Sequence, residues 1–96
     1  MPSAYLIVLY NEIGDASRLD PYSALAAPAI EKAGGTIIAK GAPARSYEAG
    51  RAELSVLVRF DSVEAAVALY ESAEYRESLN ALGELNIRDV RIVAGM

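Results

Sequence analysis

The sequence predicts an α+β fold in which a four-stranded antiparallel sheet carries its helices on one face. Along the 96 residues, apolar positions switch between the period of strands, about 2, and that of helices, about 3.6. The segments follow in the order strand, helix, strand, strand, helix, strand, with one further helix before the last strand. Right-handed crossovers place both main helices of this βαββαβ order on the same face of the sheet.

The first strand is expected over residues 4–10, which are apolar or tyrosine at both odd and even positions. Such a run is typical of a strand buried on both faces. The first helix is expected to have Asp20 as its N-cap and Pro21 as its first residue, and to end at Gly34 and Gly35. Pro28 removes one backbone hydrogen bond and predicts a kink or an early break.

Two strands are expected next, over residues 36–40 and 53–61, separated by a loop that begins at Gly41. The second of them alternates most clearly, because its even-numbered residues from 54 to 60 are all apolar and its odd-numbered residues are mostly polar. The even-numbered face is therefore expected to lie in the core.

Ser62 and Ser72 are predicted N-caps, because each precedes a helical run with a glutamate in its first turn. The first of these helices is expected to bury one stripe of residues: Val63, Ala66, Val67 and Tyr70. The second is expected to end at Gly83 and to bury Tyr75, Leu79 and Leu82. The last strand is expected over residues 88–95.

The composition predicts one small domain, residues 1–96, that associates with a second copy of itself. Hydrophobic residues make up 53% of the chain and cysteine is absent, so no disulfide compensates for the small core of so short a chain. The predicted helices cover only one face of the sheet. We therefore expect a homodimer in which the bare sheet face meets the same face of the second copy.

Charge and residue content exclude several functions. A net charge of −4 without a basic stripe argues against nucleic-acid binding. The absence of histidine and cysteine removes thiolate catalysis, Ser–His pairs and the common zinc sites, and we expect neither a metal nor a cofactor. Residues 4–10 are too short to cross a bilayer and no positively charged leader precedes them, so we expect a cytoplasmic protein without membrane contact.

The order of several short motifs along the chain resembles that of one family. The motifs are Tyr5-Leu6-Ile7, residues 28–35, residues 60–70, Ser72 to Tyr75, and Val93-Ala94-Gly95. This order is similar to that of the DUF1330 family (domain of unknown function), small bacterial proteins of the ferredoxin-like, dimeric α+β barrel type. The resemblance implies this fold and a two-fold dimer, but no particular reaction.

Three arginines are the first candidates for a binding site. Arg59 replaces an acidic residue expected from the family pattern, and Arg59 and Arg91 are both expected on the sheet face between two copies. Arg45 lies in the loop that follows Gly41. A buried arginine requires a carboxylate partner or a bound anion. Arg59 and Arg91 either pair with acidic side chains at the dimer interface, namely Glu12, Glu53 or Asp61, or hold a small carboxylate ligand. Arg45 is a further candidate contact to such a ligand.

Tyrosines are the second set of candidates. Tyr75 and Tyr70 flank the corner between the last two helices, where the alternative is a purely structural role with a buried ring. Tyr47 lies between Arg45 and Arg51, either at a pocket mouth or in a solvated loop. The candidate ligand-binding residues are therefore Arg45, Tyr47, Arg59, Tyr75 and Arg91, and no catalytic residue is singled out.

Three functions stay open at this point. The first is a homodimer that binds a small apolar or weakly acidic metabolite between sheet and helices. The second is a cofactor-independent enzyme, since the superfamily implied by the resemblance contains isomerases, cyclases and monooxygenases that act on aromatic or polyketide-like substrates. The third is a purely structural dimerisation module. An enclosed cavity would favour the first two over the third.

Overall fold

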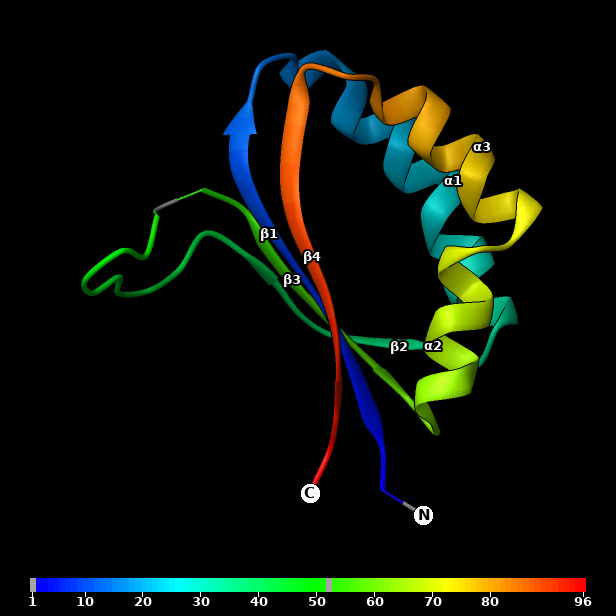
Figure 1. Cartoon of the computed structure of the whole chain (residues 1–96). Coiled ribbons are helices and arrows are strands. Elements are labelled where there is room, and N and C mark those ends of the chain that lie inside the picture. Colours follow the sequence, from blue (N-terminus) through cyan, green and yellow to red (C-terminus); the bar gives the residue numbers. More distant parts are fainter. Residues whose placement is uncertain (1, 52) are drawn as a thin grey trace.

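The computed structural model describes residues 2–51 and 53–96. Within them the elements follow in the order β1 (Ala4–Ile13), the 3₁₀ helix η1 (Ala16–Arg18), α1 (Leu19–Lys32), β2 (Thr36–Gly41), β3 (Ser55–Phe60), α2 (Val63–Tyr70), α3 (Ala73–Leu82) and β4 (Asn86–Ala94). The strands form one antiparallel sheet in the order β2-β3-β1-β4. The α-helices lie on one face of it and leave the other uncovered (Figure 1). This is the predicted α+β, βαββαβ arrangement, with α3 as the additional helix.

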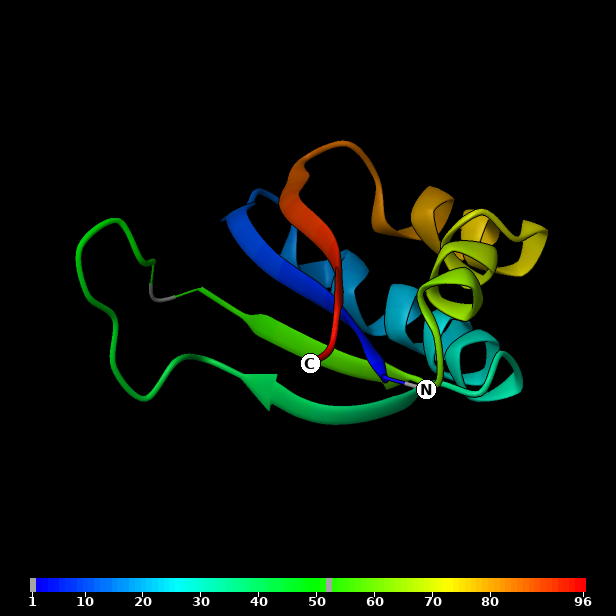
Figure 2. The same cartoon turned by 60° about the horizontal axis from the view of Figure 1, so that its bottom comes forward.

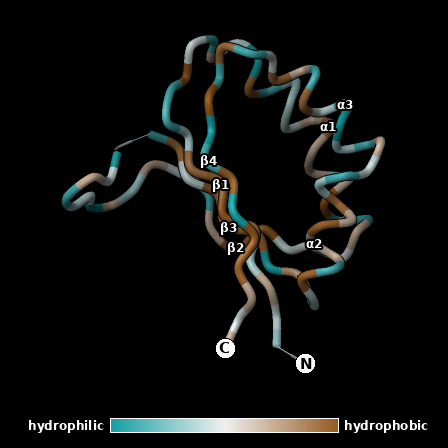
Figure 3. Tube along the Cα trace, viewed as in Figure 1, coloured by the Kyte–Doolittle hydropathy of each residue, from teal (hydrophilic) through white to brown (hydrophobic). Residues whose placement is uncertain are grey.

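The face of the sheet beneath the helices is the core. Its residues are even-numbered in β1, β3 and β4, so that Leu6 lies opposite both Val58 and Ile92. Leu6, Val58 and Phe60 are each 1% exposed. Hydrophobic residues are concentrated along the middle of these strands (Figure 3). The alternation predicted for β3 is therefore confirmed.

Two β-bulges change which residues reach the helix side of the sheet. In β2 the register shifts between Ile37 and Ala39, so that Lys40 and not Ala39 lies opposite Val56. In β1 the register with β4 shifts after Tyr10. A bulge inserts one extra residue and so reverses the alternation beyond it. Lys40 consequently lies on the same face as the core residues.

The helix α1 begins earlier than predicted. Asp15 accepts a hydrogen bond from the backbone N–H of Ser17 and opens the 3₁₀ turn, which runs directly into α1. Asp20 lies within the first turn of α1, so its prediction as the N-cap is wrong. The physical reason is that the 3₁₀ turn supplies the entry to the helix, which leaves Asp20 on the helical surface.

Pro28 does not break α1, which continues to Lys32. Both Pro28 and Ala24 are exposed, so solvent can reach the carbonyl oxygen of Ala24 that loses its partner. The helix ends as predicted at the glycine pair. Gly34 adopts a φ of 86°, and the backbone N–H of Gly35 donates to the carbonyl of Ile30 at 2.8 Å.

Both predicted serine caps are present. Ser62 Oγ accepts from the backbone N–H of Ala65 at 3.1 Å, and Ser72 Oγ accepts from that of Tyr75 at 3.2 Å. The buried stripe of α2 differs from the prediction, since its buried residues are Ala66 and Leu69 whereas Val63 is 37% exposed. The helix is rotated so that Leu69, the larger side chain, enters the core.

The segment of residues 42–51 extends away from the sheet and from all the helices (Figure 2). It therefore contributes little to the core. No helix in residues 2–51 and 53–96 combines the length and the hydropathy that a bilayer span requires.

Candidate functional site

A cavity of about 210 Å³ lies between the sheet and α1. Its walls come from all four strands, from one face of α1 and from a single residue of α3, Tyr75. Most of the wall is aliphatic, with Leu6, Val8 and Val56 on the sheet side and Ala26 and Ile30 on the side of α1. The helix positions 19, 22, 23, 26 and 30 face the cavity because residues three and four apart share one face of a helix.

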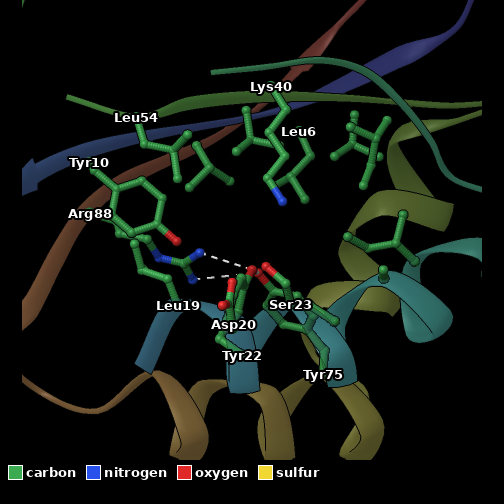
Figure 4. Close-up of a pocket in the computed structure, with 17 residues that line it drawn as sticks. Leu6, Tyr10, Leu19, Asp20, Tyr22, Ser23, Lys40, Leu54, Tyr75 and Arg88 are labelled. Carbon is green, nitrogen blue, oxygen red and sulfur yellow. Dashed lines mark hydrogen bonds between the residues drawn. The ribbon is translucent and has the colours of Figure 1, made fainter. Parts of the chain in front are cut away.

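Arg88 of β4 forms the polar end of this cavity together with three tyrosines (Figure 4). Its guanidinium donates to the hydroxyl of Tyr22 at 3.0 Å and to that of Tyr75 at 3.4 Å. Its Cζ atom also lies 5.0 Å from the ring centroid of Tyr22 and 5.6 Å from that of Tyr10. These contacts fix the orientation of the guanidinium plane and stabilise its charge through the aromatic faces.

The two tyrosine hydroxyls leave one donor unused. Tyr22 Oη and Tyr75 Oη lie 2.6 Å apart, so one hydroxyl donates to the other, and both accept from Arg88. A phenol carries a single O–H proton. One of the two protons therefore has no acceptor among the described residues. It is available to an oxygen atom placed in the cavity.

Tyr22 and Tyr10 are neutral at ordinary pH. Burial raises the pKa of Tyr22 well above its usual value, an effect that neighbouring Tyr75 increases and the charge of Arg88 opposes. Burial also raises the pKa of Tyr10, again against the effect of Arg88. The guanidinium of Arg88 is consequently a permanent cation that lies against these two neutral tyrosines.

Arg88 has no carboxylate partner in the part of the chain that the structure describes. Ion pairs are formed there by Arg18 with Asp15, by Lys32 with Glu74 and by Arg91 with Asp89. A half-buried guanidinium without a counter-charge is costly, because neutral hydroxyls replace only part of its hydration. An anion bound next to it would remove this cost.

Three polar residues line the cavity apart from this cluster: Asp20, Ser23 and Lys40. Asp20 and Ser23 come from the first turns of α1, on the same side as Tyr22, and the amine of Lys40 points inward from the side of the sheet (Figure 4). Lys40 reaches this position through the bulge in β2. The cavity thus combines an apolar wall with two cationic groups, a free phenol proton and one carboxylate.

Of the five residues predicted from sequence, Tyr75 alone lines this cavity. Arg59 and Arg91 share the uncovered face of the sheet, where Arg59 donates to Ser3 Oγ and Arg91 pairs with Asp89. Arg45 is exposed in the segment after β2, and Tyr47 in the same segment is 75% exposed. The structure therefore does not bring these four residues to the cavity, and their ligand role stays a prediction.

Sequence reasoning missed Arg88. Arg88 was not among the candidate arginines, although it has the same parity as Val90 and Ile92 and lies directly opposite Tyr10. The signal was present in the alternation of the last strand. Lys40 could not be found in this way, since the bulge that turns it inward leaves no clear mark in the sequence.

The chain belongs to the family described as Domain of unknown function (DUF1330), whose model matches residues 3–96. No protein with curated annotation matches it. The predicted family is thus confirmed.

Solved structures share the fold at low sequence identity. The protein of unknown function RPA0582 from Rhodopseudomonas palustris superposes with a TM-score of 0.72 at 16% identity, over 97% of this chain and 80% of its own. A conserved protein from Methanosarcina mazei reaches a TM-score of 0.59 at 15% identity, over 100% of this chain and 95% of its own. A protein of unknown function from Bacteroides thetaiotaomicron, described as a possible oxidoreductase, reaches 0.57 at 15% identity, over 96% and 94% of the two chains. At these identities the likeness shows the fold alone.

Proposed function

We propose that this protein binds a small organic acid with an apolar body in the cavity between the sheet and α1. One observation carries the proposal: Arg88, a cation without a carboxylate partner in the described residues, forms the polar end of an otherwise largely aliphatic cavity. A concave apolar site with a few convergent polar groups is the usual form of a small-molecule site.

The arrangement favours a carboxylate over an inorganic anion. The guanidinium and the free phenol proton provide adjacent donors, which suit the two oxygens of a carboxylate. The aliphatic wall formed by Leu6, Val8 and Val56 would stay in contact with water if only phosphate or sulfate were bound. An aromatic or branched aliphatic tail covers this wall and gains about 25 cal/mol for each Å² removed from water.

The test is a thermal-shift titration with phenylpropanoate. The wild-type protein should be stabilised by RT ln(1 + [L]/Kd), about 2.7 kcal/mol at one hundred times Kd. Arg88→Met should lose most of this ligand-dependent shift. Arg59→Met is the matched control, because Arg59 is exposed on the opposite face of the sheet.

Equal shifts in wild type and Arg88→Met would contradict the site. A loss of the shift in Arg59→Met with Arg88→Met unaffected would place the ligand on the outer sheet face, as the prediction for Arg59 and Arg91 requires. No shift with any aromatic or aliphatic carboxylate would leave the structural module as the better description.

We also propose that the protein is a homodimer through the uncovered sheet face. No helix of the described residues covers this face, and the apolar residues that share it with Arg59 and Arg91 are Tyr5, Ile7, Leu9, Leu57 and Val93. Leu9 is 37% and Val93 47% exposed. A contiguous apolar surface of this kind is typical of a protein interface.

A further inference from the structure

We propose that the same cavity catalyses enolisation of α-keto acids, with Asp20 as the general base. The inference rests on the proposed carboxylate site and adds to it a chemical step and a substrate class. An α-keto acid carries a carboxylate beside a ketone oxygen, so it requires a cationic clamp and an adjacent neutral hydrogen-bond donor. Arg88 and the hydroxyl pair of Tyr22 and Tyr75 provide both groups within 3.4 Å of one another.

The hydroxyl pair is suited to a developing oxyanion. Its one free proton has no acceptor in the described residues, and both phenol oxygens are polarised by hydrogen bonds from Arg88. Such pre-oriented donors stabilise charge that appears on a carbonyl oxygen during reaction, and they need no rearrangement to do so. The free O–H donor and the contact with Arg88 therefore suit the two hydroxyls to stabilise negative charge on the ketone oxygen of the substrate.

Asp20 is the carboxylate among the residues that line the cavity. It lies on α1 beside Tyr22, on the side of the cavity that holds the hydroxyl pair (Figure 4). In the proposed pose the substrate carboxylate binds Arg88, the ketone oxygen accepts from the hydroxyl pair, and the adjacent methylene carbon faces Asp20. Asp20 is also exposed, so a proton on it exchanges with solvent.

The step balances without a cofactor. The Asp20 carboxylate removes a proton from the carbon next to the ketone, and the electron pair of the broken C–H bond forms a carbon–carbon double bond. The π electrons of the ketone move onto its oxygen, which the free phenol proton and Arg88 stabilise. Return of the proton from Asp20 to carbon regenerates the keto acid, and delivery of a proton to oxygen gives the enol.

The experiment measures hydrogen–deuterium exchange at the methylene of phenylpyruvate in D₂O by proton NMR. The full chain should accelerate exchange above the protein-free background. Asp20→Asn should lose about a hundredfold of the protein-dependent rate, as expected for removal of a general base. It should keep the wild-type thermal shift with phenylpropanoate, which has the carboxylate and ring but no ketone.

Two further variants test the hydroxyl pair and the requirement that the carboxylate lie in the cavity. The double variant Tyr22→Phe, Tyr75→Phe should lower the exchange rate, because it removes the free donor and leaves Arg88 in place. Glu77→Gln, an exposed carboxylate on α3 outside the cavity, should exchange at the wild-type rate.

The outcomes distinguish the inference from the proposed function. A wild-type protein that is stabilised by phenylpropanoate but exchanges phenylpyruvate only at background rate overturns the enolisation and leaves the binding site. Wild-type exchange in Asp20→Asn overturns Asp20 as the base. If phenylpropanoate gives no shift, the carboxylate site and the inference built on it both fall.

Discussion

The position of Arg88 in β4 determines the chemistry of the cavity. In the register between β1 and β4 it lies opposite Tyr10, one row beyond the aliphatic pair Val8 and Val90. Its side chain therefore enters the space beneath α1, where Tyr22 and Tyr75 meet it from two different helices. Arg91, three residues later, projects to the other face and pairs with Asp89. Two arginines of one strand thus have opposite surroundings because side chains alternate.

Ionisation of the buried tyrosines should destabilise the fold at alkaline pH. An unfolded tyrosine ionises near pH 10, at about its ordinary pKa, whereas burial raises the pKa of Tyr22 and Tyr10 in the folded state. The stability that this difference provides is fully present below about pH 10 and decreases as pH rises further, because the unfolded state then binds fewer protons. Denaturant unfolding at increasing pH should show a smaller decrease for Tyr22→Phe than for wild type. Identical decreases would show that Tyr22 ionises normally in the folded protein.

Removal of the Phe60 side chain should strongly destabilise the fold. It is 1% exposed, and its ring lies so close to Gly35 that a Cβ atom on that glycine would be 2.8 Å away. Phe60→Ala should lower the free energy of unfolding by about 3 to 5 kcal/mol, measured by denaturant titration, because it leaves a cavity under the helices. A decrease below about 1 kcal/mol would mean that the site collapses around the missing ring.

At the scale of elements, local signals determine where the last two helices begin. Ser72 accepts from the N–H of Tyr75 and donates to the carbonyl of Leu69 at 2.7 Å, so it links the end of α2 to the start of α3. Ser62 caps α2 by accepting from the backbone N–H of Ala65. Ser62→Ala and Ser72→Ala should each lower stability by roughly 0.5 to 2 kcal/mol and leave the affinity for phenylpropanoate unchanged. Loss of binding at an unchanged melting temperature would assign the serine to a ligand site.

The fold could be predicted from sequence more completely than the site. Alternation in β3, the serine caps and the glycine pair after α1 are local signals, and each leads to the observed element. Which residues line the cavity depends, in contrast, on strand register and on where α1 begins. Lys40 reaches the cavity through a bulge, and Asp20 lines it because a 3₁₀ turn starts α1 before the predicted cap. The bulge arises from strand pairing across the molecule, which a linear pattern does not encode. The 3₁₀ turn begins at a local cap, Asp15, which the sequence prediction passed over in favour of Asp20.

At the scale of the whole molecule, the sheet separates a face covered by helices from an uncovered face. The helix side holds the cavity, and the polar residues that line it reach it from α1, α3, β2 and β4. On the outer side Ile7 lies between Leu57 of β3 and Arg91 of β4, so apolar and charged residues share this face. The proposed ligand and the proposed second copy would therefore lie on opposite sides of the sheet and would not compete. Charge on the outer face should then disturb association without disturbing the cavity.

Ile7→Lys should convert the protein from a dimer to a monomer. A lysine at the centre of the outer face would place an unpaired charge in the interface, whereas in a monomer its amine is solvated. Light scattering should give twice the chain mass of 10.2 kDa for wild type and the single mass for the variant. Leu25→Lys is the control, since Leu25 is 42% exposed on α1, away from that face.

The melting temperature of wild type should also rise with protein concentration, because association stabilises the folded state. A wild-type mass of 10.2 kDa at micromolar concentration would contradict the dimer, and the apolar outer face would then require a different partner.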